Sequence, residues 1–132
     1  MHIFVYGSLK KGYFNHPLLD RIGARFVGKA LSPPNYDIFD LGAFPGMIYG
    51  DYSVAGEVYR VDDITPVDRL EGHPNFYKRE PMKDFNFRKV NEPVETYILQ
   101  VPDEYSRKKP LPLIIDEGFG PYKEWKSNRI SR

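Results

Sequence analysis

The stretch from His2 to Gly12 joins an apolar run to a glycine-flanked loop, an arrangement that suits the binding of a ligand. His2-Ile3-Phe4-Val5-Tyr6 is short and shows no alternation of polar and apolar residues, which predicts a buried strand. The loop from Gly7 to Gly12 follows at once. Backbone N–H groups in such a bend can point into a cavity, where they bind anions and carbonyl oxygens.

The loop lacks the residues that common phosphate-binding and nucleophilic motifs require. Gly7 and Gly12 have the spacing of a Walker A loop, but Tyr13-Phe14 stands where Lys and Ser/Thr are needed. No G-x-G-x-x-G is present, and Ser8 is not in a G-x-S-x-G elbow. The three histidines form no recognisable triad and have no metal-ligand spacing: His2, His16 and His73. We therefore expect no phosphate loop, no serine nucleophile and no metal site.

Composition narrows the class of protein further. The chain has 132 residues, which predicts one domain over residues 1–132, and residues 103–132 are expected to form an extended C-terminal tail. The absence of cysteine excludes disulfides and thiolate catalysis. A formal net charge of +1 gives no reason to expect a nucleic-acid or membrane partner. Without a long apolar span or a signal-peptide pattern, a cytoplasmic protein is expected.

The elements that must position the loop are mostly short strands. Strands are expected over 2–6, 25–31, 36–39, 54–61, 76–82 and 94–101, and coil follows Pro102. Two short helices are expected, one capped by Asn15 and one by Thr65, the second ending at Glu71-Gly72. Phe44-Pro45-Gly46 is expected to be a loop. This pattern predicts an α+β fold, a compact mixed β-barrel with short flanking helices.

Six segments resemble one known family. They are Val5-Tyr6-Gly7-Ser8-Leu9-Lys10, Asn15-His16, Phe44-Pro45-Gly46, Gly56-Glu57-Val58-Tyr59, Leu70-Glu71-Gly72 and Tyr77-Lys78-Arg79. In order and spacing they are similar to the γ-glutamylcyclotransferase-like proteins, in particular to small members similar to γ-glutamylaminecyclotransferase. The likeness covers about residues 3 to 101, and the C-terminal segment matches poorly.

The resemblance implies a reaction and a site. In the family, the α-amine of a small γ-glutamyl substrate attacks its own γ-carbonyl and releases an amine and 5-oxoproline, with no metal or organic cofactor. Carried over to this chain, the family's substrate loop is formed by Tyr6, Gly7, Ser8 and Leu9. The acid/base is Glu71, and Tyr97 and Tyr77 are expected to line the pocket. The helix dipole raises the pKa of a C-terminal carboxyl only slightly, so an acid/base with a pKa near neutral would need burial as well. We therefore expect Glu71 to point into a partly dry cavity.

Several alternatives stay open at this point. Glu57 is a rival proton carrier, although a mid-strand carboxylate more often pairs with an arginine such as Arg79 or accepts tyrosine hydrogen bonds. The same scaffold could carry γ-glutamyl transfer or hydrolysis, or serve as a non-catalytic small-molecule-binding or interaction domain. The sequence leaves open the leaving amine and the choice between monomer and homodimer.

Overall fold

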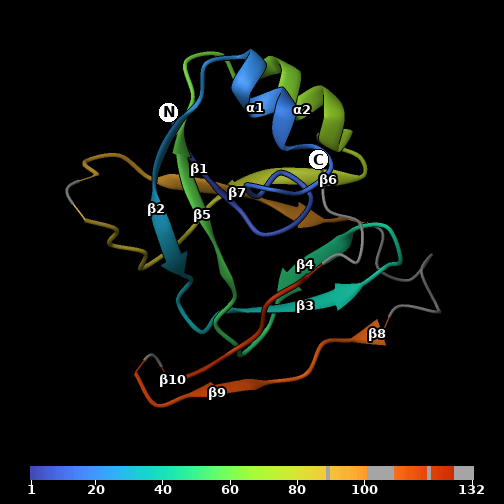
Figure 1. Cartoon of the computed structure of the whole chain (residues 1–132), viewed down its shortest axis with the longest axis vertical. Coiled ribbons are helices and arrows are strands. Elements are labelled where there is room, and N and C mark those ends of the chain that lie inside the picture. The colour runs from blue at the N-terminus through green and yellow to red at the C-terminus, as the bar shows by residue number, and fades with distance from the viewer. Residues whose placement is uncertain (89, 101–108, 119, 127–132) are drawn as a thin grey trace.

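The computed structural model describes residues 1–88, 90–100, 109–118 and 120–126 (Figure 1). The helices are α1 (His16–Arg21) and α2 (Thr65–Glu71). The strands are β1 (His2–Val5), β2 (Arg25–Leu31), β3 (Tyr36–Asp40), β4 (Pro45–Tyr49), β5 (Ala55–Arg60), β6 (Tyr77–Pro81), β7 (Val94–Leu99), β8 (Lys109–Pro110), β9 (Ile114–Asp116) and β10 (Gly120–Tyr122). The α+β class is confirmed, with mostly strands and two short helices.

Strand β1 lies in the middle of a five-stranded sheet with the order β2-β5-β1-β7-β6. It pairs antiparallel with β5 and parallel with β7. Since both faces of this sheet are covered, Ile3 and Phe4 are each 0% exposed although they point to opposite sides. A strand buried on both faces has a continuous apolar run, which is why β1 shows no alternation. The loop that follows β1 therefore begins at the middle of the sheet.

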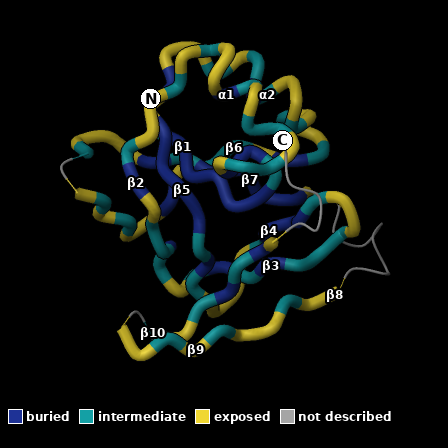
Figure 2. The backbone as a smooth tube through the Cα atoms, viewed as in Figure 1, coloured by how far each residue is buried: buried dark blue, intermediate teal, exposed yellow. Residues whose placement is uncertain are grey.

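The two faces of the sheet contribute to separate cores. Ile3 and Val5 pack with residues of both helices, including Leu19 of α1 and Val67 of α2. Phe4 belongs to the other core, which includes residues of β3 and β4. Figure 2 shows the buried backbone of the sheet between the helices on one side and β3 and β4 on the other. The helices therefore cover the face on which a carboxylate at the end of α2 can meet the loop after β1.

The described strands do not close into a barrel, so this part of the expectation is corrected. A second sheet has the order β4-β3-β8, and β9 and β10 form a two-stranded sheet. The five-stranded sheet keeps β2 and β6 as its edges. Pro33 and Pro34 follow β2, and because proline has no N–H to donate, the ladder stops there and the chain turns into the second sheet.

Two predicted local features differ from the structure. Phe44-Pro45-Gly46 was expected to be a loop, but β4 begins at Pro45, which is paired with Asp40. A proline fits the first residue of a strand because no ladder donor is needed there. Helix α2 begins at Thr65, but Ile64 occupies the N-cap position, and the Thr65 N–H donates to Asp63 Oδ1 at 3.0 Å.

The segment after Pro102 is not coil throughout. Residues 101–108, 119 and 127–132 lie outside the described residues. Between them, β8 pairs with β3, and β9 pairs with β10. Trp125 is 2% exposed and belongs to the core of the second sheet. The assignment of residues 1–132 to one domain with a tail over 103–132 stays a prediction.

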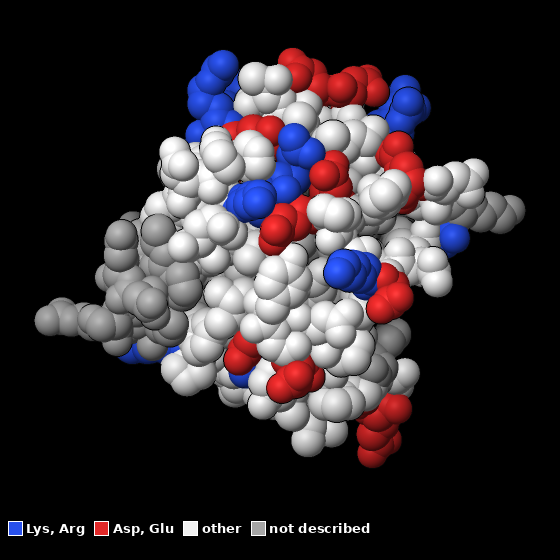
Figure 3. Space-filling model, turned by 180° about the vertical axis from the view of Figure 1, so that it is seen from behind, with Lys and Arg blue, Asp and Glu red and all other residues white. Residues whose placement is uncertain are grey.

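The length of the helices and the distribution of surface charge concern possible membrane and nucleic-acid partners. No helix in the described ranges is long and apolar enough to cross a membrane. On the face shown in Figure 3, Lys and Arg side chains are interspersed with Asp and Glu side chains. This mixture agrees with the near-balance of charge in the sequence, where the formal net charge is +1.

Candidate active site

The loop after β1 is anchored at both ends by buried side chains. Tyr6 is 6% exposed and Leu9 is 3% exposed. The Tyr6 hydroxyl donates to the Tyr97 carbonyl at 2.7 Å and accepts from the Met47 N–H at 3.3 Å. Burial raises the pKa of Tyr6 well above its ordinary value, so this hydroxyl stays protonated as a structural donor. The loop is thereby tied to β7 and β4.

Ser8 is held by the first helix. The Asn15 Nδ2 donates to Ser8 Oγ at 2.8 Å, and the Asn15 N–H donates to the Ser8 carbonyl at 2.9 Å. Asn15 occupies the N-cap position of α1 as expected, but its side chain makes no cap hydrogen bond. It braces the loop instead. Asn15 is therefore a residue of the candidate site, and the interpretation of Asn15 as a helix cap did not predict this role.

Gly7 is required because Pro45 approaches its Cα closely. A Cβ at this position would lie 2.7 Å from Pro45 Cγ and 2.8 Å from Pro45 Cδ, both ring atoms that cannot rotate away. We expect Gly7→Ala to lower the free energy of unfolding by about 1–3 kcal/mol, the usual cost of overpacking. Denaturant unfolding measures this change. Gly118→Ala is the matched control, since its nearest atom is the Asp116 Oδ1 at 3.3 Å; an equal loss in both variants would contradict the steric explanation.

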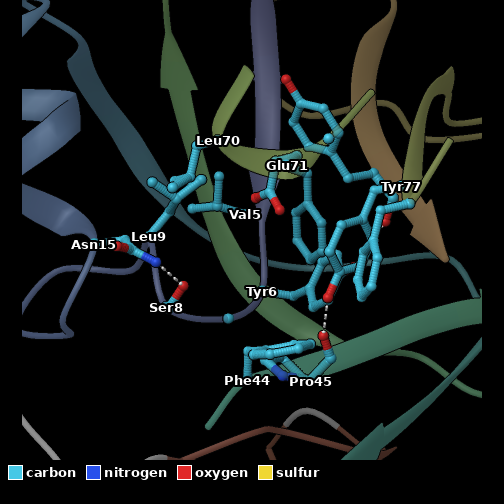
Figure 4. Close-up of a pocket in the computed structure, with 15 residues that line it drawn as sticks. Val5, Tyr6, Ser8, Leu9, Asn15, Phe44, Pro45, Leu70, Glu71 and Tyr77 are labelled. Atoms are coloured by element: carbon cyan, nitrogen blue, oxygen red, sulfur yellow. Dashed lines mark hydrogen bonds between the residues drawn. The ribbon is translucent and has the colours of Figure 1, made fainter. Parts of the chain in front are cut away.

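Helix α2 ends in a way that directs Glu71 toward the loop. Gly72 adopts the left-handed conformation, with φ of 67°, and ends the helix as the sequence predicts. The His73 N–H donates to the Asp68 carbonyl at 3.0 Å, which closes the last turn. Figure 4 shows the Glu71 carboxylate pointing into the space beside Val5, Tyr6 and Tyr77.

The surroundings of Glu71 favour its protonated form. Burial, and to a smaller extent the Asp68 carboxylate, raise the pKa of Glu71 from 4.5 to about 7. Within the described residues, no protein group donates a hydrogen bond to the Glu71 carboxylate. The carboxyl group can therefore gain or lose a proton near neutral pH and is open to a ligand.

Two further tyrosines build the wall opposite the loop. The Tyr77 hydroxyl donates to the Pro45 carbonyl at 2.6 Å, as Figure 4 shows. The Tyr97 hydroxyl donates to Asp68 Oδ1 at 2.6 Å. Both side chains are largely buried, at 6% and 2% exposed. Their hydroxyl groups hold other parts of the wall in place.

All seven residues that the resemblance implied lie around one cavity of about 390 Å³. These residues are Tyr6, Gly7, Ser8, Leu9, Glu71, Tyr77 and Tyr97. Sequence reasoning did not assign a site role to several other residues that line it: Phe4, Val5, Asn15, Phe44, Pro45, Leu70, Gly72 and Phe76. Most of them lie in or beside segments that carry the family resemblance, which was the signal available. The lining is mainly apolar, with one carboxylate, as expected for a small-molecule site.

The rival carboxylate, Glu57, lies outside this cavity. It is 8% exposed and accepts hydrogen bonds from the Lys11 N–H at 2.8 Å and from the Tyr59 hydroxyl at 2.9 Å. It lines a second, larger cavity of about 990 Å³ together with Lys10 and Lys11. The Lys10 Nζ there donates to the Trp125 carbonyl at 2.8 Å. Glu57 thus accepts tyrosine and backbone hydrogen bonds, one of the two roles expected for a mid-strand carboxylate, and it does not face the loop of Gly7 to Leu9.

The described residues contain no group of three or more His, Asp or Glu side chains that could hold a metal ion. The chain has no cysteine. The expectation that the protein works without a metal or an organic cofactor stays a prediction.

Comparison with known proteins connects this geometry to a family. The family described as Gamma-glutamyl cyclotransferase, AIG2-like, matches residues 3–119. A protein of Vibrio cholerae is 41% identical over 83 residues, covering 61% of this chain and 70% of that protein. The gamma-glutamylcyclotransferase family protein YtfP of Escherichia coli K12 is 38% identical over 82 residues, covering 61% of this chain and 70% of that protein.

A solved structure supports the fold along the chain. The crystal structure of an AIG2-like protein from Mus musculus has a TM-score of 0.70 and 24% sequence identity, and it covers 97% of this chain and 89% of that chain. At this identity the likeness supports the fold alone. The match over residues 3–119 places this chain in the AIG2-like gamma-glutamyl cyclotransferase family, which confirms the resemblance and its expectation of an enzyme.

Proposed function

We propose that the protein cyclises a small γ-glutamyl compound, releasing 5-oxoproline and a free amine or amino acid. The observation that carries the proposal is the meeting, in one cavity, of the Gly7-Ser8-Leu9 loop and a carboxylate whose pKa is raised to about 7. The names of relatives such as YtfP point to the same chemistry. The substrate contains both the nucleophile and the electrophile, so the protein mainly has to hold it folded.

Glu71 acts as the proton carrier in this proposal. The substrate's α-ammonium must lose a proton before its nitrogen can attack the γ-carbonyl carbon, and the ionised Glu71 takes that proton. The leaving nitrogen must gain a proton when its bond to the carbonyl carbon breaks, and the protonated Glu71 returns it. The attacking nitrogen still carries a second surplus proton, which it loses as the lactam forms, and the released amine takes that proton up and leaves as an ammonium. A pKa of about 7 suits both steps because each form is well populated at neutral pH.

The loop stabilises the developing oxyanion. The Lys10 N–H donates to the Gly7 carbonyl, and the Lys11 N–H donates to Glu57. Within the described residues, the Ser8 and Leu9 N–H groups have no such protein acceptor. They are available to donate to the γ-carbonyl oxygen as negative charge develops on it. Bracing of Ser8 by Asn15 keeps these donors in place.

Ser8 has no role as a nucleophile in this reaction, since the attacking group belongs to the substrate. We expect Ser8→Ala to lower kcat/KM only moderately, through loss of the Asn15 Nδ2 hydrogen bond to its Oγ. Steady-state kinetics measures the loss, and intact-protein mass spectrometry looks for adducts. A γ-glutamyl-enzyme adduct on Ser8 would contradict direct cyclisation and indicate covalent transfer instead.

One assay tests the proposal against its rivals. The purified protein is incubated with a panel of γ-glutamyl amines and γ-glutamyl amino acids, and the products are separated by chromatography. Release of 5-oxoproline supports cyclisation. Free glutamate would support hydrolysis, a new γ-glutamyl conjugate with an added acceptor would support transfer, and the absence of turnover would favour a binding domain.

A further inference from the structure

Asp68 lies three residues before Glu71 on α2, so the two side chains lie on neighbouring parts of one helix face. Its carboxylate accepts three hydrogen bonds from two other elements. The Tyr97 hydroxyl of β7 donates at 2.6 Å, and the Arg79 Nε and Nη2 of β6 donate at 3.0 and 3.1 Å. Asp68 therefore ties the end of α2 to the two strands that form the far wall of the candidate site.

The same contacts keep Asp68 ionised. Although its burial acts in the opposite direction, hydrogen bonds from Arg79 and Tyr97 hold the pKa of Asp68 below its ordinary value. Arg79 in turn donates to both oxygens of Glu95 at 3.0 Å, so the guanidinium is shared between two carboxylates. The contact of Arg79 Nε and Nη2 with the two Asp68 oxygens is bidentate, and such a contact fixes geometry as well as charge.

The other titratable side chains of the described residues that line the cavity with Glu71 are tyrosines. They are Tyr6, which directly follows β1, Tyr77 of β6 and Tyr97 of β7. Burial is the main cause that raises the pKa values of Tyr6 and Tyr97. Asp68 is the one charged side chain of the described residues that perturbs the Glu71 carboxyl group. Asp68 itself does not line the cavity; its charge and its position are set by Arg79, which also lies outside the lining, and by Tyr97, which is part of it.

We propose that Asp68 is a positioning residue for the reaction: clamped by Arg79 and Tyr97, it fixes the end of α2 and holds a permanent negative charge beside Glu71. This role rests on the proposed function of Glu71. Burial is the larger cause of the raised pKa of Glu71, and the negative charge of Asp68 adds to it by opposing ionisation. The hydrogen bond from Tyr97 also sets the orientation of that ring in the cavity wall.

Asp68→Asn tests the role because asparagine keeps the shape and removes the charge. We expect the acid limb of the kcat/KM profile to move to lower pH by about half a unit, the effect in water of a unit charge at the roughly 5–6 Å between neighbouring positions of a helix face. A ¹³C NMR titration of the Glu71 carboxyl, assigned with Glu71→Gln, should show the same direction. Because the titration needs no turnover, it tests Asp68 even if the assay detects no 5-oxoproline, an outcome that would overturn the proposed function alone.

Two further variants keep the test decisive. Glu95→Gln removes a charge from the far side of Arg79 and should leave the Glu71 titration within about 0.2 unit of wild type, since Asp68 keeps its charge. If Asp68→Asn does not fold because Arg79 loses one of its two carboxylate partners, Asp68→Asn/Arg79→Gln removes both charges and should still lower the pKa of Glu71. An unchanged titration in a folded Asp68 variant, or an equal shift in Glu95→Gln, would overturn the proposal.

Discussion

Glu71→Gln is expected to keep the fold and to lose about 10²–10⁴-fold in kcat, the usual contribution of a general acid/base. Glutamine has nearly the shape of glutamate, so it fills the same place at the end of α2. It cannot accept the proton of the substrate ammonium or return one to the leaving nitrogen. Release of 5-oxoproline measures turnover, and far-UV circular dichroism checks the fold.

Glu57→Gln is the matched control for this prediction. Glu57 lines the second cavity and accepts hydrogen bonds from the Lys11 N–H and the Tyr59 hydroxyl, so its substitution should reduce turnover far less. Retention of more than about a third of wild-type activity by Glu71→Gln would remove Glu71 as the proton carrier, given the size of effect that acid/base groups usually have. A larger loss in Glu57→Gln would move that role to Glu57.

The second large effect is on stability and its dependence on pH. The pKa of Glu71 is raised in the folded state from 4.5 to about 7, so the folded protein binds this proton more tightly than the unfolded chain. Its contribution to stability is complete below about pH 4.5 and is lost as the pH rises to 7. At about 1.4 kcal/mol per pH unit, the loss in wild type reaches up to about 3 kcal/mol.

Glu71→Gln lacks this titration and should therefore be the more stable protein at alkaline pH. We expect the difference in free energy of unfolding to grow from near zero at pH 4 to as much as about 3 kcal/mol at pH 8. Asp68 has a lowered pKa, so its contribution to the stability of the fold is lost as the pH falls below the ordinary pKa of an aspartate. Because Asp68 is present in both proteins, this contribution largely cancels in the difference. Urea unfolding at pH 4, 6 and 8 measures the difference. A difference that does not change with pH would mean that Glu71 titrates normally.

The local features of the site could be predicted from the sequence. The apolar run of β1 requires burial, and the glycines after it mark a loop. Gly72 ends α2 because only a residue without a side chain adopts its φ of 67° at little cost. These features depend on neighbours within a few residues, which is why composition and spacing determine them.

The joining of these features was decided by the tertiary structure. Residues 6–9 and Glu71 share a cavity because β1 lies at the centre of the sheet and α2 packs on one of its faces. Burial in that cavity and, to a smaller extent, the charge of Asp68 raise the pKa of Glu71. Arg79 of β6 holds Asp68 in place by a hydrogen bond. Asn15 could have capped α1, yet the nearness of Ser8 makes it a brace for the loop. Distances between distant segments, and the loss of water around a carboxylate, arise only when the whole chain packs.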